Sequence, residues 1–120
     1  MITPGTMITP GALAEQLAAQ YLQGQGLKLL QINYSCRFGE IDLILQDGDT
    51  HVFAEVRLRS SSTFGGAAAS IDARKQAKLV RAAQHYLSKL QRIPPCRFDA
   101  ILMQSTDINH IEWIKNAFTV

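Results

Sequence analysis

Two acidic residues, Asp42 and Glu55, are followed by Arg57 in the stretch of this sequence best suited to metal-assisted chemistry. They lie in two runs of alternating apolar and polar residues, separated by Asp47-Gly48-Asp49. Such alternation is typical of strands with one buried face. An Asp-Gly pair between two such runs favours a hairpin. The sequence therefore predicts a hairpin over residues 39–59, with one acid on each strand.

The register of this hairpin decides whether the two carboxylates meet. A two-residue loop of Gly48 and Asp49, or a four-residue loop, places Asp42 directly opposite Glu55. A loop of Asp47 and Gly48 makes the pair diagonal, and in all these cases the acids share a face within roughly 5–8 Å. A three-residue loop would put them on opposite faces.

Two like charges facing each other across a ladder destabilise it. At about 4 Å and an effective dielectric constant near 20, the repulsion is roughly 4 kcal/mol. A positive group is therefore expected between Asp42 and Glu55. Either a divalent cation or the neighbouring Arg57 and Arg59 could supply it.

Length and composition limit the class of protein. A chain of 120 residues with 47% hydrophobic residues forms one domain with a real core. Its apolar runs are too short to span a membrane, and its first residues lack the pattern of a signal peptide. Cys36 and Cys96 are far apart, which favours free thiols and a cytoplasmic protein. The net charge of +2 is small, so any affinity for nucleic acid must come from local clusters of charge.

The N-terminal part predicts a tail and a helix. Residues 1–10, which contain the repeat MITPG, are expected to form a flexible tail before a single domain at 11–120. Thr9 is a good N-cap with Pro10 at the first helical position, and glycines 24 and 26 end the helix. Glu15 lies in the first turns, where its simplest role is to face the positive end of the helix dipole.

The remaining elements predict the fold class. A strand is expected at residues 27–34, a loop with Phe64 at 60–67, a helix at 71–93, and strands at 97–103 and 108–118. The order helix, three strands, helix, two strands indicates an α/β fold, a mixed central sheet flanked by helices. An unpaired edge strand or the Trp113 region offers a surface for a homodimer. Asp99, in a buried strand, is expected to form a structural salt bridge.

The second helix carries basic residues on one side. After Asp72 it contains no acid, which favours contact with an anionic polymer. Gln76 falls on the apolar side and needs a partner. It either caps a loop carbonyl or points towards the carboxylates. The basic residues are Arg74, Lys78, Arg81, His85, Lys89 and Arg92.

The pattern D-x12-E-x-R on a hairpin resembles the PD-(D/E)xK nuclease signature. The whole chain from Gly11 to about Met103 resembles the uncharacterised bacterial YraN-like family, whose fold is similar to restriction endonucleases and Holliday-junction resolvases. The matching stretches are G-x-x-x-E from Gly11, CRFGEIDLI from Cys36, DGDTHVFAEV from Asp47 and RKQ from Arg74.

This resemblance implies a restriction-endonuclease-like core and a metal-dependent endonuclease that cuts DNA, with branched or damaged DNA as candidate substrates. Mg²⁺ or Mn²⁺ would bind Asp42 and Glu55, with the carbonyl of Val56 as a third ligand, since these ions prefer oxygen ligands. Glu15 would either support these ligands or bind a second metal ion. Arg57 and Gln76 would complete the catalytic set. The DNA backbone would contact, without reading sequence, a set of basic side chains: Arg59, Arg74, Lys78, Arg81 and Lys89.

The sequence departs from the nuclease pattern at one position. Arg57 stands where the pattern has lysine, and arginine stays charged and cannot act as a base. Its planar fork could also pair with the two acids and take the place of the cation. One alternative is therefore a nucleic-acid-binding module that has lost catalysis. A further alternative is a protein-interaction domain with a salt-bridge network on the hairpin.

Overall fold

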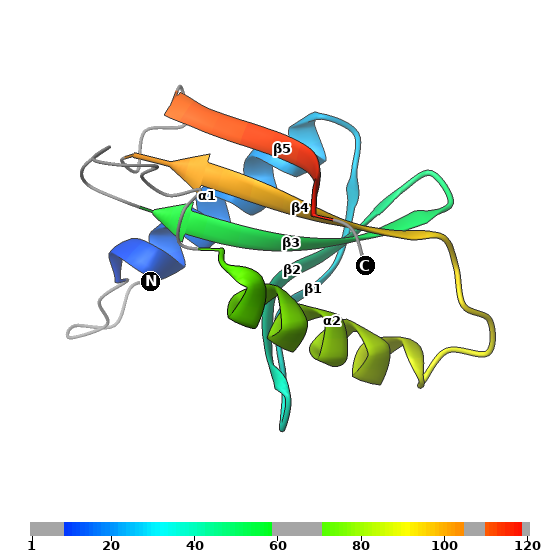
Figure 1. The fold of residues 1–120 in the computed structure, drawn as a ribbon. Coiled ribbons are helices and arrows are strands. Elements are labelled where there is room, and N and C mark those ends of the chain that lie inside the picture. Colours follow the sequence, from blue (N-terminus) through cyan, green and yellow to red (C-terminus); the bar gives the residue numbers. More distant parts are fainter. Residues whose placement is uncertain (1–8, 59–70, 105–109, 119–120) are drawn as a thin grey trace, which may run out of the picture.

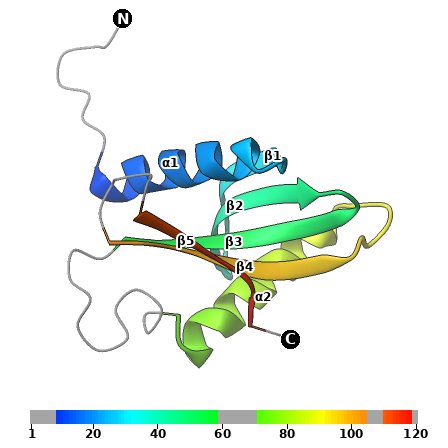
Figure 2. The same ribbon diagram turned by 90° about the horizontal axis from the view of Figure 1, so that it is seen from above.

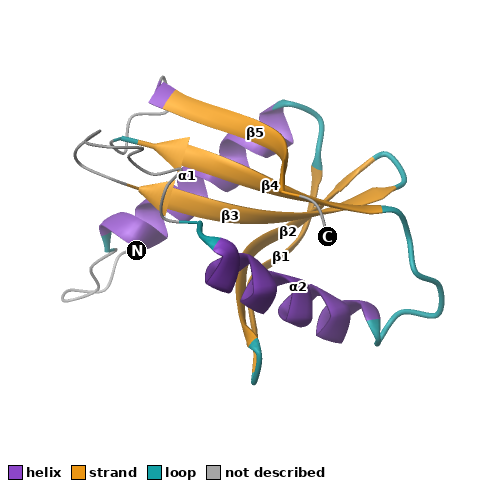
Figure 3. Ribbon diagram, viewed as in Figure 1, coloured by secondary structure: helices purple, strands orange, loops and turns teal. Residues whose placement is uncertain are grey.

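The structure, a computed structural model, describes residues 9–58, 71–104 and 110–118. Within these ranges, two helices and five strands follow one another in the order α-β-β-β-α-β-β, as predicted (Figures 1 and 3). Their bounds are α1 Pro10–Gly24, β1 Lys28–Cys36, β2 Gly39–Asp47, β3 Thr50–Leu58, α2 Ala73–Leu87, β4 Cys96–Met103 and β5 Ile111–Phe118. The predicted tail at residues 1–10 lies mostly outside this described part of the chain, as do Arg59 and the predicted loop at 60–67.

The five strands form one mixed sheet in the order β1-β2-β3-β4-β5. Three of the four strand pairs are antiparallel, and β3 pairs with β4 in parallel. A parallel pair needs a crossover connection, and α2 lies within it. Figure 2 shows the result: α1 covers one face of the sheet and α2 the other. The mixed sheet flanked by helices agrees with the predicted fold class.

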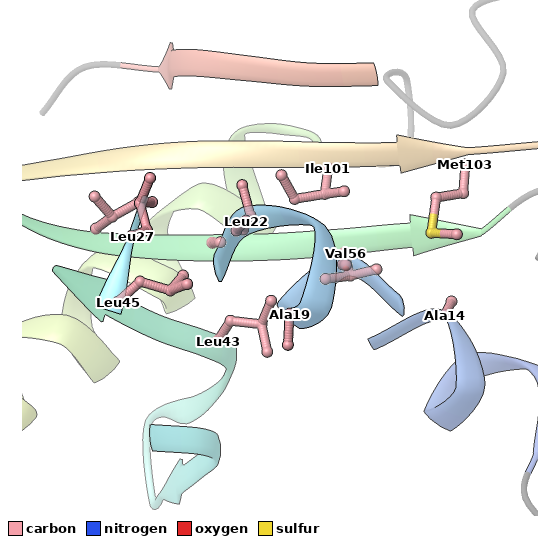
Figure 4. Packing of buried hydrophobic residues seen from close by; sticks show 12 residues of the cluster. Ala14, Ala19, Leu22, Leu27, Leu43, Leu45, Val56, Ile101 and Met103 are labelled. Carbon is pink, nitrogen blue, oxygen red and sulfur yellow. The ribbon is translucent and has the colours of Figure 1, made fainter. Parts of the chain in front are cut away.

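Each helix packs on its own core. Alanines and Leu22 of α1 lie against Leu43, Leu45, Val56 and neighbouring side chains of β2–β4 (Figure 4). On the opposite face, Leu79 and two alanines of α2 pack against aromatic and aliphatic side chains. The central strands are consequently buried on both faces, which explains why apolar residues interrupt their alternation. Neither described helix is both long and apolar enough to cross a lipid bilayer.

The helix boundaries have local causes. The side chain of Thr9 accepts a hydrogen bond from the Ala12 N–H, and Pro10 begins α1 as predicted. The prediction that the second helix runs to residue 93 is wrong, because α2 ends at Leu87. There the Ser88 hydroxyl donates to the carbonyl of His85 at 2.7 Å and helps to close the last turn. Lys89 therefore lies beyond the helix.

Asp99 is a structural residue, as predicted. Its side chain is fully buried and accepts hydrogen bonds from Arg97 Nε at 3.1 Å and Trp113 Nε1 at 2.9 Å. It also accepts one from the backbone N–H of Asn116 at 3.1 Å, beside an irregularity in the β4–β5 ladder. Arg97 extends to Asp47 at 2.9 Å. Asp99 thus fastens β5 to the rest of the sheet.

The β2–β3 hairpin splits at its open end. Pairing runs from Asp47 opposite Thr50 to Leu43 opposite Ala54, so the two loop residues are 48 and 49. Beyond this ladder β3 stays beside β4, whereas β2 stays with β1 and both bend away past α2 (Figure 1). Ile41 accordingly packs in the core of α2, although Leu43 packs in the core of α1. The next residues in register beyond the ladder are Asp42 and Glu55.

Candidate active site

Asp42 occupies the point where the two strands separate. The β2–β3 ladder has ended before Val56, so the backbone of β2 does not pair with it there. Oδ2 of Asp42 instead accepts a hydrogen bond from the Val56 N–H at 2.8 Å. This bond fixes the Asp42 carboxylate between β2 and β3. The register that makes Asp42 face Glu55 is one of the alternatives that the sequence left open, and the loop of Gly48 and Asp49 selects it.

Glu55 is buried against Asp42. Only 3% of Glu55 is exposed, and its carboxyl group hydrogen bonds to Asp42. Burial raises the pKa of Glu55 to about 9, and the hydrogen bond and the charge of Asp42 add to the effect. Oε2 of Glu55 is buried and has no hydrogen-bond partner among the described residues. Glu55 thus carries a proton at neutral pH and has one buried oxygen atom without a partner in the described part of the chain.

Glu15 reaches Asp42 from the opposite side. Burial is the main cause that raises the pKa of Glu15 to about 7, followed by the charge of Asp42 and a hydrogen bond to it. A hydrogen bond with Asn33 of β1 acts in the opposite direction. The simple helix-dipole role expected for Glu15 does not explain this position, because the first turn of α1 contains no acid and Glu15 lies beyond it. Asp42 therefore links Glu15 to Glu55.

Arg57 does not form the two-pronged pair that the sequence allowed. Its Nη2 lies 3.8 Å from Oε1 of Glu55, which is a long single contact. Its Nε is buried without a hydrogen-bond partner in the described part of the chain. Arg57 instead lines a pocket of about 360 Å³ together with Asp42 and Glu15. The other lining residues are Pro10, Gly11, Ala14, Val56 and Leu58.

Lys75 is the site residue that sequence reasoning missed. It lies in the first turn of α2, half-buried, and its positive charge favours the ionised form of Glu55. Its backbone N–H is held by the capping carboxylate of Asp72 at 2.9 Å. The spacing of the basic side chains along the helix singled out Arg74. The available signal for Lys75 was its place three residues after the N-cap Asp72, in the first turn of a helix that must meet the sheet.

Gln76 has a hydrogen-bond partner just before the start of α2. Its side-chain amide donates to the carbonyl of Ile71 at 3.2 Å, the capping role that the sequence left open. It also borders a small apolar cavity of about 100 Å³ with residues of β4 and β5, including Ala100 and Ile114. The structure thus gives Gln76 a local structural contact.

The predicted basic residues lie on and just after α2. Arg74 and Lys78 border a hollow of about 380 Å³ together with Lys75 and Asp72. Arg81 is exposed on the same helix. The ammonium group of the exposed Lys89 lies 5.1 Å from the centre of the Tyr34 ring. A positively charged surface thus extends along α2 from the end that lies near Glu55.

The acids form two pairs that share Asp42. Within the described ranges, no three His, Cys, Asp or Glu side chains are grouped so as to hold one metal ion. Val56 contributes its N–H to Asp42. A metal-ligand role for its carbonyl stays a prediction, as does the metal itself.

Comparisons with known proteins identify relatives over nearly the whole chain. The model of a family described as "Uncharacterised protein family UPF0102" matches residues 14–103. A UPF0102 protein of Nitrosomonas europaea is 60% identical over 108 residues, which cover 90% of this chain and 92% of that protein. A UPF0102 protein of Nitrosospira multiformis is 53% identical over 115 residues, covering 96% and 97%. A UPF0102 protein of Psychromonas ingrahamii is 56% identical over 108 residues, which cover 90% of this chain and 88% of that protein.

Proposed function

The chain belongs to the uncharacterised protein family UPF0102, and we propose that it hydrolyses phosphodiester bonds of nucleic acid, DNA in the first place, with a divalent cation at Asp42 and Glu55. The observation that carries the proposal is the buried oxygen atom of Glu55, which has no hydrogen-bond partner among the residues that the structure describes and lies beside the Asp42 carboxylate. A carboxyl group buried in this way costs stability unless a ligand uses it. We place the protein in the cytoplasm, because Cys36 and Cys96 are both free.

The donor atoms fit a hard cation. Mg²⁺ is held in proteins by one or two carboxylates, with water and phosphate oxygens completing its shell. Asp42 and Glu55 offer such a pair, and Glu15 adds a third carboxyl group on the far side of Asp42. When bound, the ion supplies charge to offset that of the phosphate and lowers the pKa of a water molecule.

The side chains of the chain would share the remaining work. The Val56 N–H keeps the Asp42 carboxylate in place before a substrate arrives, so little reorganisation is needed. Glu15, with a pKa of about 7, is suited to accept a proton from a water molecule at neutral pH. Arg57 lines the pocket and stays charged, so it would bind a phosphate oxygen. The basic surface of α2 would hold the nucleic-acid backbone.

A cleavage assay tests this function. Labelled single-stranded, duplex and branched DNA, and RNA, are incubated with Mg²⁺ or Mn²⁺. We expect cleavage by the native protein and none by Asp42→Ala or Glu55→Gln. Asp42→Asn keeps an acceptor for the Val56 N–H and controls for misfolding. Glu112→Gln changes an exposed acid on β5 and should cut at the native rate. Cleavage by Asp42→Asn at the native rate would overturn the proposal.

One observation favours a second candidate, a nucleic-acid-binding module without catalysis. Arg57 replaces the lysine of the nuclease pattern and touches Glu55 only through a long contact. If the native protein binds DNA but takes up neither Mg²⁺ nor Mn²⁺ in a calorimetric titration, this second function replaces the first. If it binds the metal at Asp42 and cleaves, the second function is excluded.

A further inference from the structure

The turn between β1 and β2 carries a small stack of side chains on its tip. The guanidinium carbon of Arg37 lies 4.8 Å from the centre of the Phe38 ring. The Phe38 ring meets His85 of α2 edge to face, with their centres 6.0 Å apart. Phe38 is partly buried in this contact, whereas Arg37 is exposed. The planar guanidinium group of Arg37 therefore lies against the Phe38 ring, and the Phe38 ring packs against α2 through His85.

The turn is also fastened to α2. A Cβ atom added at Gly39 would come within 3.6 Å of the Lys78 side chain, so the two backbones approach closely. Behind the tip, the hydroxyl of Tyr34 hydrogen bonds to Nδ1 of His85, and Lys89 lies over the Tyr34 ring. These contacts hold the turn in one position relative to α2 (Figure 1).

The α2 surface beside the stack is positive, whereas Glu40, an exposed acid, lies two residues from Phe38 on the hairpin. Residues 73–98 contain no acid, and Lys75, Lys78 and His85 recur at helical spacing on the side of α2 that meets the hairpin. Lys75 acts on Glu55 at one end of this side, and His85 touches Phe38 at the other. Basic side chains of α2 thus lie near both the acid pair and the turn.

The spacing suits one nucleic-acid strand. Phe38 and Asp42 are four residues apart in an extended chain, which is roughly 13 Å. Successive phosphates advance about 3.4 Å along the axis of a duplex and are further apart in an extended single strand, so this separation corresponds to fewer than four nucleotides. A strand with one phosphate at the acids can therefore reach the turn.

We propose that the Arg37–Phe38 stack binds an unpaired base of the nucleic-acid strand that lies at the Asp42–Glu55 pair. An exposed guanidinium plane offers a flat face on which a base can stack, and only an unpaired base has a free face at this site. A duplex would contact the turn through its phosphate backbone, and there the planar guanidinium group of arginine would bind no better than the ammonium group of a lysine. This inference rests on the proposed function and adds the structure of the substrate to it.

Fluorescence anisotropy tests the inference. The probes are a fluorescein-labelled mixed-sequence DNA strand and the same strand paired with its complement, with Ca²⁺ in place of Mg²⁺ to prevent cleavage. Arg37→Lys keeps the charge and removes the plane, and Phe38→Leu removes the supporting ring. Each should weaken single-strand binding about 5- to 30-fold and leave duplex binding within about twofold. Lys28→Ala, an exposed lysine at the far end of β1, is the control and should change neither.

The outcomes separate this inference from the proposed function. If the native protein binds both probes and Arg37→Lys binds them as tightly as the native protein does, Arg37 contributes only its positive charge. The inference is then overturned, while the proposed function stands. If Arg37→Lys loses both probes equally, the turn contacts the backbone and the inference fails as well. If the native protein binds neither probe, the proposed function and the inference fail together.

Discussion

Replacing Glu55 by Gln should change how the stability of the metal-free protein depends on pH. The pKa of Glu55 is about 9 in the folded protein, against an ordinary value of 4.5. Between these values the folded protein binds more protons than the unfolded chain. The contribution of Glu55 to stability is therefore complete below pH 4.5 and is lost as the pH rises towards 9. At 1.36 kcal/mol per unit, the loss between pH 4.5 and 7 is about 3 kcal/mol.

The Gln side chain does not ionise, so the variant should lack this loss. Urea unfolding in EDTA at pH 5, 7 and 8.5 measures it. We expect the variant to gain stability relative to the native protein as the pH rises. Some pH dependence should remain below about pH 7, because Glu15 still titrates with a raised pKa. Glu112→Gln, which alters an exposed acid, should follow the native curve.

The same reasoning predicts the protons released on metal binding. At pH 8 a group with a pKa of about 9 is roughly nine-tenths protonated. Binding Mg²⁺ to the ionised form should therefore release about one proton. Titration calorimetry in two buffers with different ionisation enthalpies counts it. Parallel stability curves for the native protein and Glu55→Gln, together with no proton release, would refute the claim that burial beside Asp42 keeps Glu55 protonated.

Three further substitutions test single contacts. Arg57→Lys restores the nuclease pattern and should raise metal-dependent cleavage by about tenfold; an equal or lower rate would show that the arginine does not limit activity. Lys75→Met removes a positive charge that favours ionised Glu55, so proton release on Mg²⁺ binding should persist to a higher pH than in the native protein. Asp99→Asn leaves Arg97 without its buried charge partner and should cost roughly 3 kcal/mol or more in urea unfolding, followed by the fluorescence of Trp113, the only tryptophan.

The parts of the fold that local sequence determines were predictable. The alternation around the Asp-Gly turn gave the central hairpin, and Thr9 with Pro10 gave the start of α1. These features depend on residues close together in the chain. The end of α2 was not predictable in this way, because Ser88 closes the helix through a contact that has no strong sequence signal.

In the candidate site, the sequence predicted the positions of the residues on the β2–β3 hairpin but not of those on the helices. Asp42 and Glu55 share a face because of the loop length, which the sequence limits to a few alternatives. The approach of Glu15 and Lys75 depends instead on how α1 and α2 dock on opposite faces of the sheet. For Gln76 the sequence left two roles open, and the structure shows the contact with a loop carbonyl, while a role at the acids stays a prediction.

The hydrogen bond from Val56 to Asp42 bears on how related sequences should be compared. An aspartate at this position helps to keep two diverging strands together, so a homologue that has lost all catalysis still benefits from it. The glutamate on the neighbouring strand brings no such benefit and weakens the folded protein above acidic pH. Under the proposed function, retention of Glu55 is therefore the more informative sign of catalysis in a related sequence, and Asp42 alone is a poor one.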